Sequence, residues 1–321
     1  MEYTRLGSTG LRVSKICFGT WRFGMETDGV IETDREEAFD LLDAAWEQGI
    51  NFIDTANVYG VDSASEQWIG EWLNSRDVDR QEVVIASKVY WTSGPVPGSD
   101  LSRKTIREEI EGTLDRLDTD YIDVYYIHRW DEDTPIRETL TALNGLIDEG
   151  KVNYIAASSM DAWKLTKAVM TSQNLDIERF EVTQPKFNAA TRPESYLDVC
   201  ADQDLAVCPW SPLEAGLLTG KYERGAEYPE GSRGDLVDWD PDERFSDRQW
   251  RVLEAVEAVA DEVDATPAQV SLRWLMDQRE FDCVPIIGAR TVDQIEENAG
   301  AAEVALSDEQ YDRIDQAYHE A

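Results

Sequence analysis

The chain has 321 residues, of which 42% are hydrophobic and 10% aromatic, so it can bury a large core and is not expected to be disordered. Its 30 Lys and Arg residues face 66 Asp and Glu residues, giving a net charge of −36, so nucleic acid and anionic membranes are not expected as partners. No apolar stretch approaches the roughly 18 residues of a membrane helix, and residues 1–10 lack the features of a signal peptide. We therefore expect a soluble, cytoplasmic protein.

The acidic excess is typical of folded proteins that work in concentrated salt. Salt screens surface carboxylates from one another, as in a halophile's cytoplasm. We therefore interpret the composition as halophilic, with an acidic surface, and expect low salt to destabilise the fold.

Eight strand-like apolar runs punctuate the chain. They are 15–20, 51–55, 82–89, 121–128, 152–159, 180–187, 205–210 and 283–289. Several are almost continuously apolar, which is typical of parallel strands that are buried on both faces. The four cysteines, Cys17, Cys200, Cys208 and Cys283, form no CxxC pair, and three of them lie in these runs. They are predicted to be buried free thiols rather than disulfides or metal ligands.

Helical patterns fill the intervals between the runs. Segments 33–49, 102–120, 134–150 and 266–278 repeat apolar residues at helical spacing. In the first of them, Thr33 with Glu36 predicts a capped start, and Gly49 predicts the end. Eight strands alternating with helices over about 300 residues predict one (β/α)8 barrel, a single domain spanning 1–321. Segment 2–14 is expected to form a hairpin that closes the barrel floor.

The connection from Ser211 to Trp250 is anomalous because it contains no strand-like run. A structureless loop of that length after the seventh strand is either a lid or a disordered insertion. A doubly wound two-domain fold is the alternative architecture, but no GxGxxG motif follows a strand to support it.

Polar residues stand where several runs end, which is where barrels carry their chemistry. Asp54, Lys88 and His128 end neighbouring runs, and Tyr59 follows Asp54 closely. Taken singly, Asp54 and Lys88 are read as a structural ion pair, Tyr59 as loop packing and His128 as structural. Together they can protonate an oxygen: an ammonium lowers the pKa of a neighbouring phenol, Asp54 holds Lys88, and a neutral His128 orients a carbonyl.

These residues and their surroundings resemble the aldo-keto reductases, in the branch of bacterial and archaeal enzymes and potassium-channel β subunits. The resemblance runs through RLGSTGLRVSKICFGTWRFG (5–24), DTANVYG, ASK, YIHRWD, GKVNYIAASS, TQPKFN, WSPLEAGLLTGKY and IIGARTVDQIEENAGA (286–301). It implies a (β/α)8 barrel, reversible NADPH-dependent or NADH-dependent reduction of aldehydes or ketones, and Asp54, Tyr59, Lys88 and His128 as catalytic residues, with Tyr59 as the general acid.

The resemblance also implies a set of cofactor-binding residues at the barrel mouth. They are Gly19, Thr20, Trp21, Ser158, Gln184, Trp210, Ser211, Leu213, Gly216, Lys221, Gly288, Ala289, Arg290, Gln294, Glu297 and Asn298. Arg290 opens a helix that follows a strand, where it can pair with a 2′-phosphate; this favours NADPH over NADH. A solvated arginine is the alternative.

Two features bear on the substrate and on the departures from the family. Ser159 stands where the family usually has Asn, which puts one amide contact in doubt, and segment 223–245 matches the family least. Candidate pocket walls are Trp21, Tyr90, Trp91 and Trp130, which would favour apolar or aromatic carbonyls unless they are ordinary packing.

The rival functions belong to other classes. A nucleotide-sensing regulatory subunit would hold the cofactor with little turnover, although the absence of an added N-terminal arm weighs against it. A two-carboxylate hydrolase needs a second strand-end acid, and a metal-dependent barrel needs partners for His128; no metal is expected. The physiological substrate and the oligomeric state, monomer or homo-oligomer, stay open.

Overall fold

Eight short parallel strands form a barrel in the computed structural model, which describes residues 1–27, 30–76, 78–92, 98–237, 239 and 243–320. In spatial order they are β11 (Ala206–Val207), β10 (Val182–Gln184), β9 (Val152–Ser158), β8 (Ile122–Ile127), β7 (Val84–Val89), β6 (Phe52–Asp54), β3 (Cys17–Gly19) and β12 (Ile286–Ile287). The ring closes where Val207 N donates to Asp282 O at 2.8 Å and Val284 N to Val207 O at 2.9 Å. The predicted (β/α)8 barrel is confirmed, and every strand lies inside one of the eight apolar runs.

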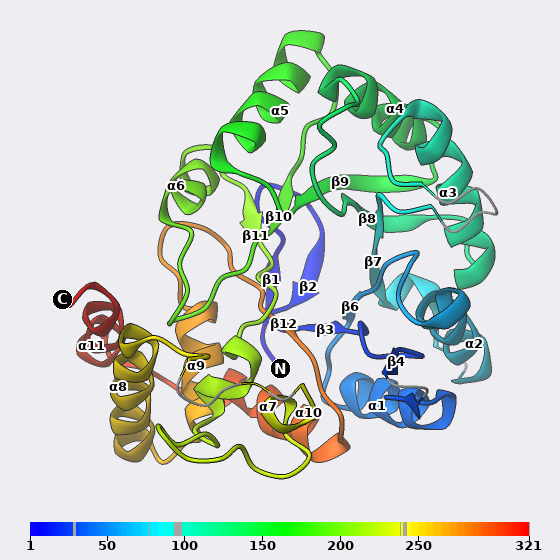
Figure 1. Ribbon diagram of the computed structural model, residues 1–321. Helices are drawn as coiled ribbons and strands as arrows, with labels where there is room; N and C mark the ends of the chain where they lie inside the picture. The colour runs from blue at the N-terminus through cyan, green and yellow to red at the C-terminus, as the bar shows by residue number, and fades with distance from the viewer. Residues whose placement is uncertain (28–29, 77, 93–97, 238, 240–242, 321) are drawn as a thin grey trace.

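Helices surround the strands, as Figure 1 shows. Their bounds are α1 (Arg35–Glu47), α2 (Ala64–Arg76), α3 (Arg103–Leu117), α4 (Ile136–Asp148), α5 (Ala162–Leu175), α6 (Glu194–Asp202), α7 (Arg233–Leu236), α8 (Asp247–Val263), α9 (Pro267–Met276), α10 (Val292–Ala299) and α11 (Asp308–His319). Because helices cover the barrel from outside and side chains fill it from inside, every residue of β7 and β8 is buried. Within the described residues, no helix is both long and apolar enough to cross a membrane.

The start of α1 differs from the prediction by one residue. Asp34, not Thr33, is the N-cap, and its side chain accepts the backbone N–H of Glu37 while the Glu37 carboxylate accepts that of Asp34. Both registers satisfy the capping-box pattern in sequence, so the spacing alone does not choose between them. Gly49 follows the helix end at φ 78°, as predicted.

The N-terminal hairpin closes the barrel floor, as predicted. Strands β1 (Tyr3–Arg5) and β2 (Arg12–Ser14) pair antiparallel, and the hairpin lies in the middle of the view in Figure 1. Leu6 and Val13 are fully buried among inward-facing residues of the barrel. Gly7 is required here, because a Cβ at its φ of 59° would stand 2.8 Å from Ala206 N.

The long connection after β11 is more ordered than the sequence predicted. Its described part contains a 3₁₀ segment, η3 (Glu214–Thr219), and α7. It also builds a small aromatic cluster with α8; the members are Leu217, Tyr222, Phe245, Trp250 and Leu253, flanked by Tyr228 and Trp239. The expected structureless lid is thus wrong in this respect: the segment carries a hydrophobic cluster of its own. A second short hairpin, β4 (Glu26–Thr27) with β5 (Val30–Ile31), was not predicted.

Candidate active site

Three neighbouring strands bring the predicted strand-end residues together. Asp54 ends β6, Lys88 lies in β7, and His128 directly follows β8, while Tyr59 lies in the turn after β6. The parallel register pairs Asp54 with Ala86 and Lys88 with Tyr126, so the side chains converge at one end of the barrel. The order of the strands in the sheet therefore brings together residues as far apart in the sequence as Asp54 and His128, which are separated by 74 positions.

Lys88 is the centre of this cluster. Its fully buried Nζ donates to Asp54 Oδ2 at 2.5 Å, to Thr55 O at 2.7 Å and to Tyr59 Oη at 3.2 Å, which occupies all three ammonium protons. Burial disfavours the charged amine, but the Asp54 carboxylate and Tyr59 outweigh it and raise the pKa of Lys88. The ammonium is therefore charged and fixed in place.

Gln184 completes the environment of Asp54. Its Nε2 donates to Asp54 Oδ1 at 2.8 Å from the end of β10, across the barrel. Asp54 thus accepts on both oxygens, which lowers the cost of burying its charge. The resemblance assigned Gln184 to a cofactor amide, and sequence reasoning missed this contact because it joins opposite sides of the barrel.

Tyr59 differs from the prediction in the direction of its pKa. Burial raises the pKa of Tyr59, and the Lys88 charge opposes this only in part. The prediction that the ammonium lowers the pKa of Tyr59 overall is therefore wrong in this structure. The cost of removing the phenolate from water exceeds the stabilisation that the Lys88 charge provides. The phenol keeps its proton at neutral pH and can donate it, with Lys88 beside it to stabilise the phenolate left behind.

His128 is held among aromatic rings. Its ring meets Tyr59 edge-on at a centroid distance of 5.8 Å and Trp91 at 4.8 Å. Burial, then the charges of Lys88 and Arg129, hold the pKa of His128 well below its usual 6.5. The imidazole is thus neutral, as predicted, and its buried Nδ1 has no hydrogen-bond partner among the described residues.

The predicted cofactor residues fall into two groups at the barrel mouth. Some are structural supports: Thr20 is fully buried and donates to Asp54 O at 3.0 Å, and Ser158 donates to Gln184 O at 2.9 Å. Gly19 allows close packing, because a Cβ there would meet Ile286 at 2.7 Å. By contrast, Trp21 and Trp210 are 40% and 38% exposed, so their rings offer apolar surface to a ligand.

The remaining predicted residues follow β11 and β12. Ser211 O accepts from Asn188, Leu213 packs against the main core, and Gly216 at φ 97° leaves room for the Lys221 chain, which a Cβ would meet at 2.6 Å. A Cβ on Gly288 would meet nothing within 4 Å. The other members are Ala289, Gln294, Glu297 and Asn298: Ala289 and Asn298 are buried, Gln294 accepts from Arg290 N, and Glu297 O accepts from Gln269.

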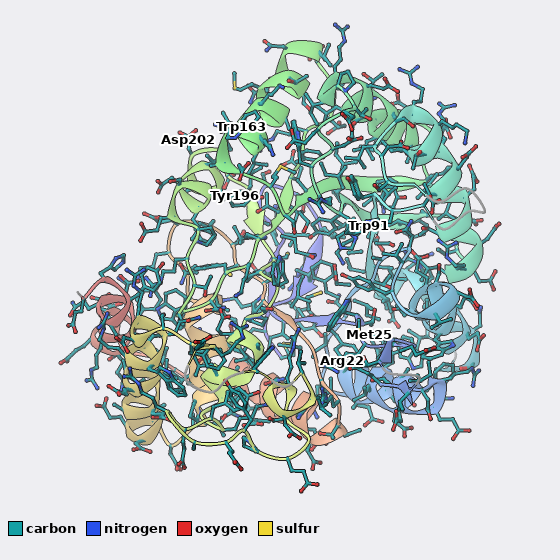
Figure 2. All side chains as sticks on the ribbon, viewed as in Figure 1. Arg22, Met25, Trp91, Trp163, Tyr196 and Asp202 are labelled. Carbon is teal, nitrogen blue, oxygen red and sulfur yellow. The ribbon has the colours of Figure 1, made fainter. Side chains whose placement is uncertain are left out.

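Four cations lie near one another at the barrel mouth, and we call Arg22, Lys221, Arg233 and Arg290 the cation cluster. Burial lowers the pKa of each, and repulsion by other cations adds to this for three of them: burial, Arg290 and Arg233 bring that of Arg22 to about 10, and burial, Arg290 and Arg22 lower that of Lys221. Burial also lowers the pKa of Arg290, and burial followed by Arg244 lowers that of Arg233. Figure 2 shows Arg22 beside the β4 region.

The cation cluster fits a polyanionic cofactor such as a dinucleotide. Arg22 pairs with Glu32, whereas Lys221, Arg233 and Arg290 form no ion pair with a described carboxylate. Cations that repel one another are stabilised by a bound anion. The sequence identified Lys221 and Arg290 and missed Arg22 and Arg233, because no spacing rule joins residues about 200 positions apart in a chain with a net charge of −36.

A cavity of about 670 Å³ opens beside Trp210. Tyr90 and Trp130, two of the four predicted walls, line it together with Arg129 and Met160. Trp91 instead packs on His128, and the Trp21 ring contacts the guanidinium groups of both Arg22 and Arg233. The four cysteines are buried and free, as predicted. In the part of the chain that the structure describes, no three His, Cys, Asp or Glu side chains gather to hold a metal ion.

Comparison with known proteins agrees with this geometry. The model of the "Aldo/keto reductase family" matches residues 15–319. A probable voltage-gated potassium channel subunit beta of Arabidopsis thaliana is 35% identical over 95% of this chain and 92% of its own. The uncharacterized oxidoreductase YrpG of Bacillus subtilis is 35% identical over 96% and 93%, and norsolorinic acid reductase B of Aspergillus parasiticus is 32% identical over 97% and 82%. The chain belongs to the aldo/keto reductase family and is an NAD(P)H-dependent oxidoreductase.

Proposed function

We propose that the protein reduces aldehydes or ketones to alcohols with NADPH, reversibly, and that Tyr59 is the general acid. The observation that carries this proposal is the coordination of Lys88, whose ammonium contacts Asp54, Thr55 and Tyr59 at once. A charged lysine on the phenol stabilises the phenolate that forms when the proton leaves. No such arrangement is needed for packing, since an apolar side chain would fill the same space at lower cost.

The four residues divide the chemistry between them. When bound, NADPH supplies the hydride for the carbonyl carbon. Tyr59 gives its proton to the carbonyl oxygen, and Lys88 holds the resulting negative charge. Neutral His128 donates a hydrogen bond that orients the same oxygen, while Asp54, fixed by Gln184, keeps Lys88 charged and in position.

The cation cluster supports NADPH over NADH. Lys221, Arg233 and Arg290 form no ion pair with a described carboxylate, and three such cations exceed what a pyrophosphate alone requires, whereas a 2′-phosphate adds up to two negative charges. Trp21 and Trp210 supply apolar surface for flat groups, and the cavity beside Tyr90 and Trp130 suits an apolar or aromatic carbonyl substrate. We further propose a cytoplasmic, salt-adapted protein, on the basis of its net charge of −36.

The test is NADPH oxidation with a panel of aromatic and aliphatic aldehydes in molar KCl, comparing the native protein with Tyr59→Phe. We expect the variant to lose kcat by about 10³-fold or more, because an acid contributes up to about 10⁴-fold, with an unchanged Kd for NADPH. The matched control is Tyr121→Phe, a tyrosine outside the site that stacks on Arg80. Equal turnover by Tyr59→Phe would refute the assignment.

A regulatory role is the second candidate, and it rests on the relative from Arabidopsis thaliana that is named a probable potassium channel subunit beta. Such a protein would bind NADPH tightly and turn over no carbonyl of the panel at a useful rate. Single-turnover measurements separate the two functions: slow hydride transfer with tight binding favours the sensor, and fast transfer favours the reductase.

A further inference from the structure

Asn57 links the turn that carries Tyr59 to two other elements. This fully buried residue lies between Asp54 and Tyr59. Its Nδ2 donates to Trp91 O at 2.7 Å and to Glu109 Oε2 at 2.7 Å. Its backbone is held as well, since its O accepts from Ser63 Oγ at 2.5 Å. Because both Nδ2 protons are used, the amide has one orientation only.

Glu109 interrupts the apolar face of α3. The buried residues around it on this helix are Ile106, Ile110, Thr113 and Leu114, yet Glu109 itself is only 5% exposed. Burying a carboxylate costs free energy that an aliphatic side chain would not incur. The carboxylate accepts the Asn57 proton, and this hydrogen bond offsets part of that cost.

The residue that accepts from Asn57 also contacts the aromatic rings beside the site. Trp91, whose carbonyl takes the other Asn57 proton, places its indole 4.8 Å from the His128 ring, and His128 in turn meets Tyr59 at 5.8 Å. Figure 2 shows Trp91 inside the ring of helices, on the side of β7 and β8. The Asn57 side-chain amide therefore connects the turn that carries Tyr59 to Trp91, the residue that packs on His128.

We propose that Asn57 and Glu109 form a positioning pair that sets the spacing between Tyr59 and His128. The proposal rests on the proposed function, in which both side chains must reach one carbonyl oxygen. Tyr59 and His128 follow different strands, β6 and β8, and Asn57 bonds to a residue that follows β7, between them. A misplacement of about 1 Å costs on the order of 10²-fold in rate, so a rigid link between these turns acts directly on kcat.

The test compares Glu109→Ala, Glu109→Gln and a matched control, Glu108→Ala. Glu108 is an exposed neighbour on the same helix, paired with Lys104. The alanine at 109 removes the acceptor and the glutamine keeps an oxygen for Asn57. We expect Glu109→Ala to lower kcat by roughly 10- to 100-fold with KM and the NADPH Kd unchanged, Glu109→Gln to recover most of it, and Glu108→Ala to behave as native.

A double-mutant cycle shows whether the two residues act as a unit. If they do, Asn57→Ala combined with Glu109→Ala loses clearly less activity than the sum of the two single losses, because both changes break the same hydrogen bond. Additive losses would overturn the pair. So would a Glu109→Gln variant no better than Glu109→Ala, or a loss that appears in NADPH affinity and thermal stability but not in kcat.

Crystal structures of the alanine and glutamine variants provide the readout that does not depend on turnover. We expect the separation of the Tyr59 and His128 rings to change in Glu109→Ala and to stay at the native value in Glu109→Gln. If the native protein reduces no carbonyl, the proposed function is wrong. The comparison of the crystal structures still shows whether Asn57 and Glu109 set the spacing of the two rings. Unchanged rings in both variants would refute it.

Discussion

The two charged regions of the barrel mouth are built in opposite ways. Around Lys88, every proton and both Asp54 oxygens have a partner within the protein. In the cation cluster, Lys221, Arg233 and Arg290 form no ion pair with a described carboxylate. Burial lowers the pKa values of all three, and neighbouring cations add to this for Lys221 and Arg233. The polar groups around Lys88 are thus satisfied without a ligand, whereas we expect the cation cluster to be stabilised by a bound anion. We infer that the Lys88 region is preorganised for proton transfer. We infer also that the cation cluster favours anion binding because a bound anion relieves the repulsion between its charges.

The largest effect is expected from breaking the complete region. Lys88→Met leaves the buried Asp54 carboxylate without its cation, so we expect the free energy of unfolding to fall by about 3–5 kcal/mol and turnover to be lost. Chemical denaturation measures the first and NADPH oxidation the second. Adding Asp54→Asn should restore part of the stability and none of the activity. Lys104→Met, on an exposed pair, should change neither; a Lys88→Met variant as stable as native would contradict the comparison.

Removing a charge from the cation cluster should have the reverse pattern. Lys221→Ala and Arg290→Ala are each expected to weaken NADPH binding by roughly 10- to 100-fold, the value of a charge-assisted contact, without lowering the stability of the free protein. Arg290→Ala should affect NADPH more than NADH, while Lys221→Ala should affect both alike. Titration calorimetry with each cofactor tests this. Arg224→Ala, in the same connection after β11 but paired with Asp247, is the control. A loss of stability of the cofactor-free protein in the cluster variants would contradict the idea that these cations repel one another.

The smallest expected effect is the contribution of His128 to the pH dependence of stability. An unfolded histidine titrates near pH 6.5, whereas burial and cations depress the pKa of folded His128. Below pH 6.5 the unfolded state therefore binds more protons, so stability falls as the pH falls from there toward the folded pKa. We expect His128→Gln to reduce this slope by up to about 1.4 kcal/mol per pH unit. Denaturation curves at several pH values measure it; identical slopes in both proteins would show that His128 titrates normally.

Local patterns in the sequence were sufficient for the barrel and for the residues that end its strands. Asp54, Lys88 and His128 were found because parallel strands place their ends together, and apolar runs locate strands well. The cap of α1 was misplaced by one residue because Thr33 and Asp34 both fit the same spacing rule. The sign of the Tyr59 pKa shift was missed because desolvation depends on packing that no sequence pattern encodes.

Contacts between distant segments were the part that sequence reasoning could not supply. Gln184 donates to Asp54 across the barrel, and Arg22 and Arg233 both contact the ring of Trp21. Glu109 offered one signal, a carboxylate at a position where the helical pattern calls for an apolar residue, but Glu108 beside it made the register ambiguous. Side chains that meet only in three dimensions have no fixed separation along the chain.

The closure of the barrel has a consequence for the order of events during synthesis. Strand β3 pairs with β12, with Cys17 opposite Ile286, so the ring is sealed by segments from nearly opposite ends of the chain. Until the ribosome has released the last strand, β3 presents an unpaired edge, and the floor hairpin lacks part of its surroundings. Contacts of such long range are slow to form, and open edges recruit neighbouring chains. We therefore expect the nascent chain to be prone to aggregation until β12 has been made, and a chain truncated just before β12 to remain so, which light scattering of such a truncated chain would test.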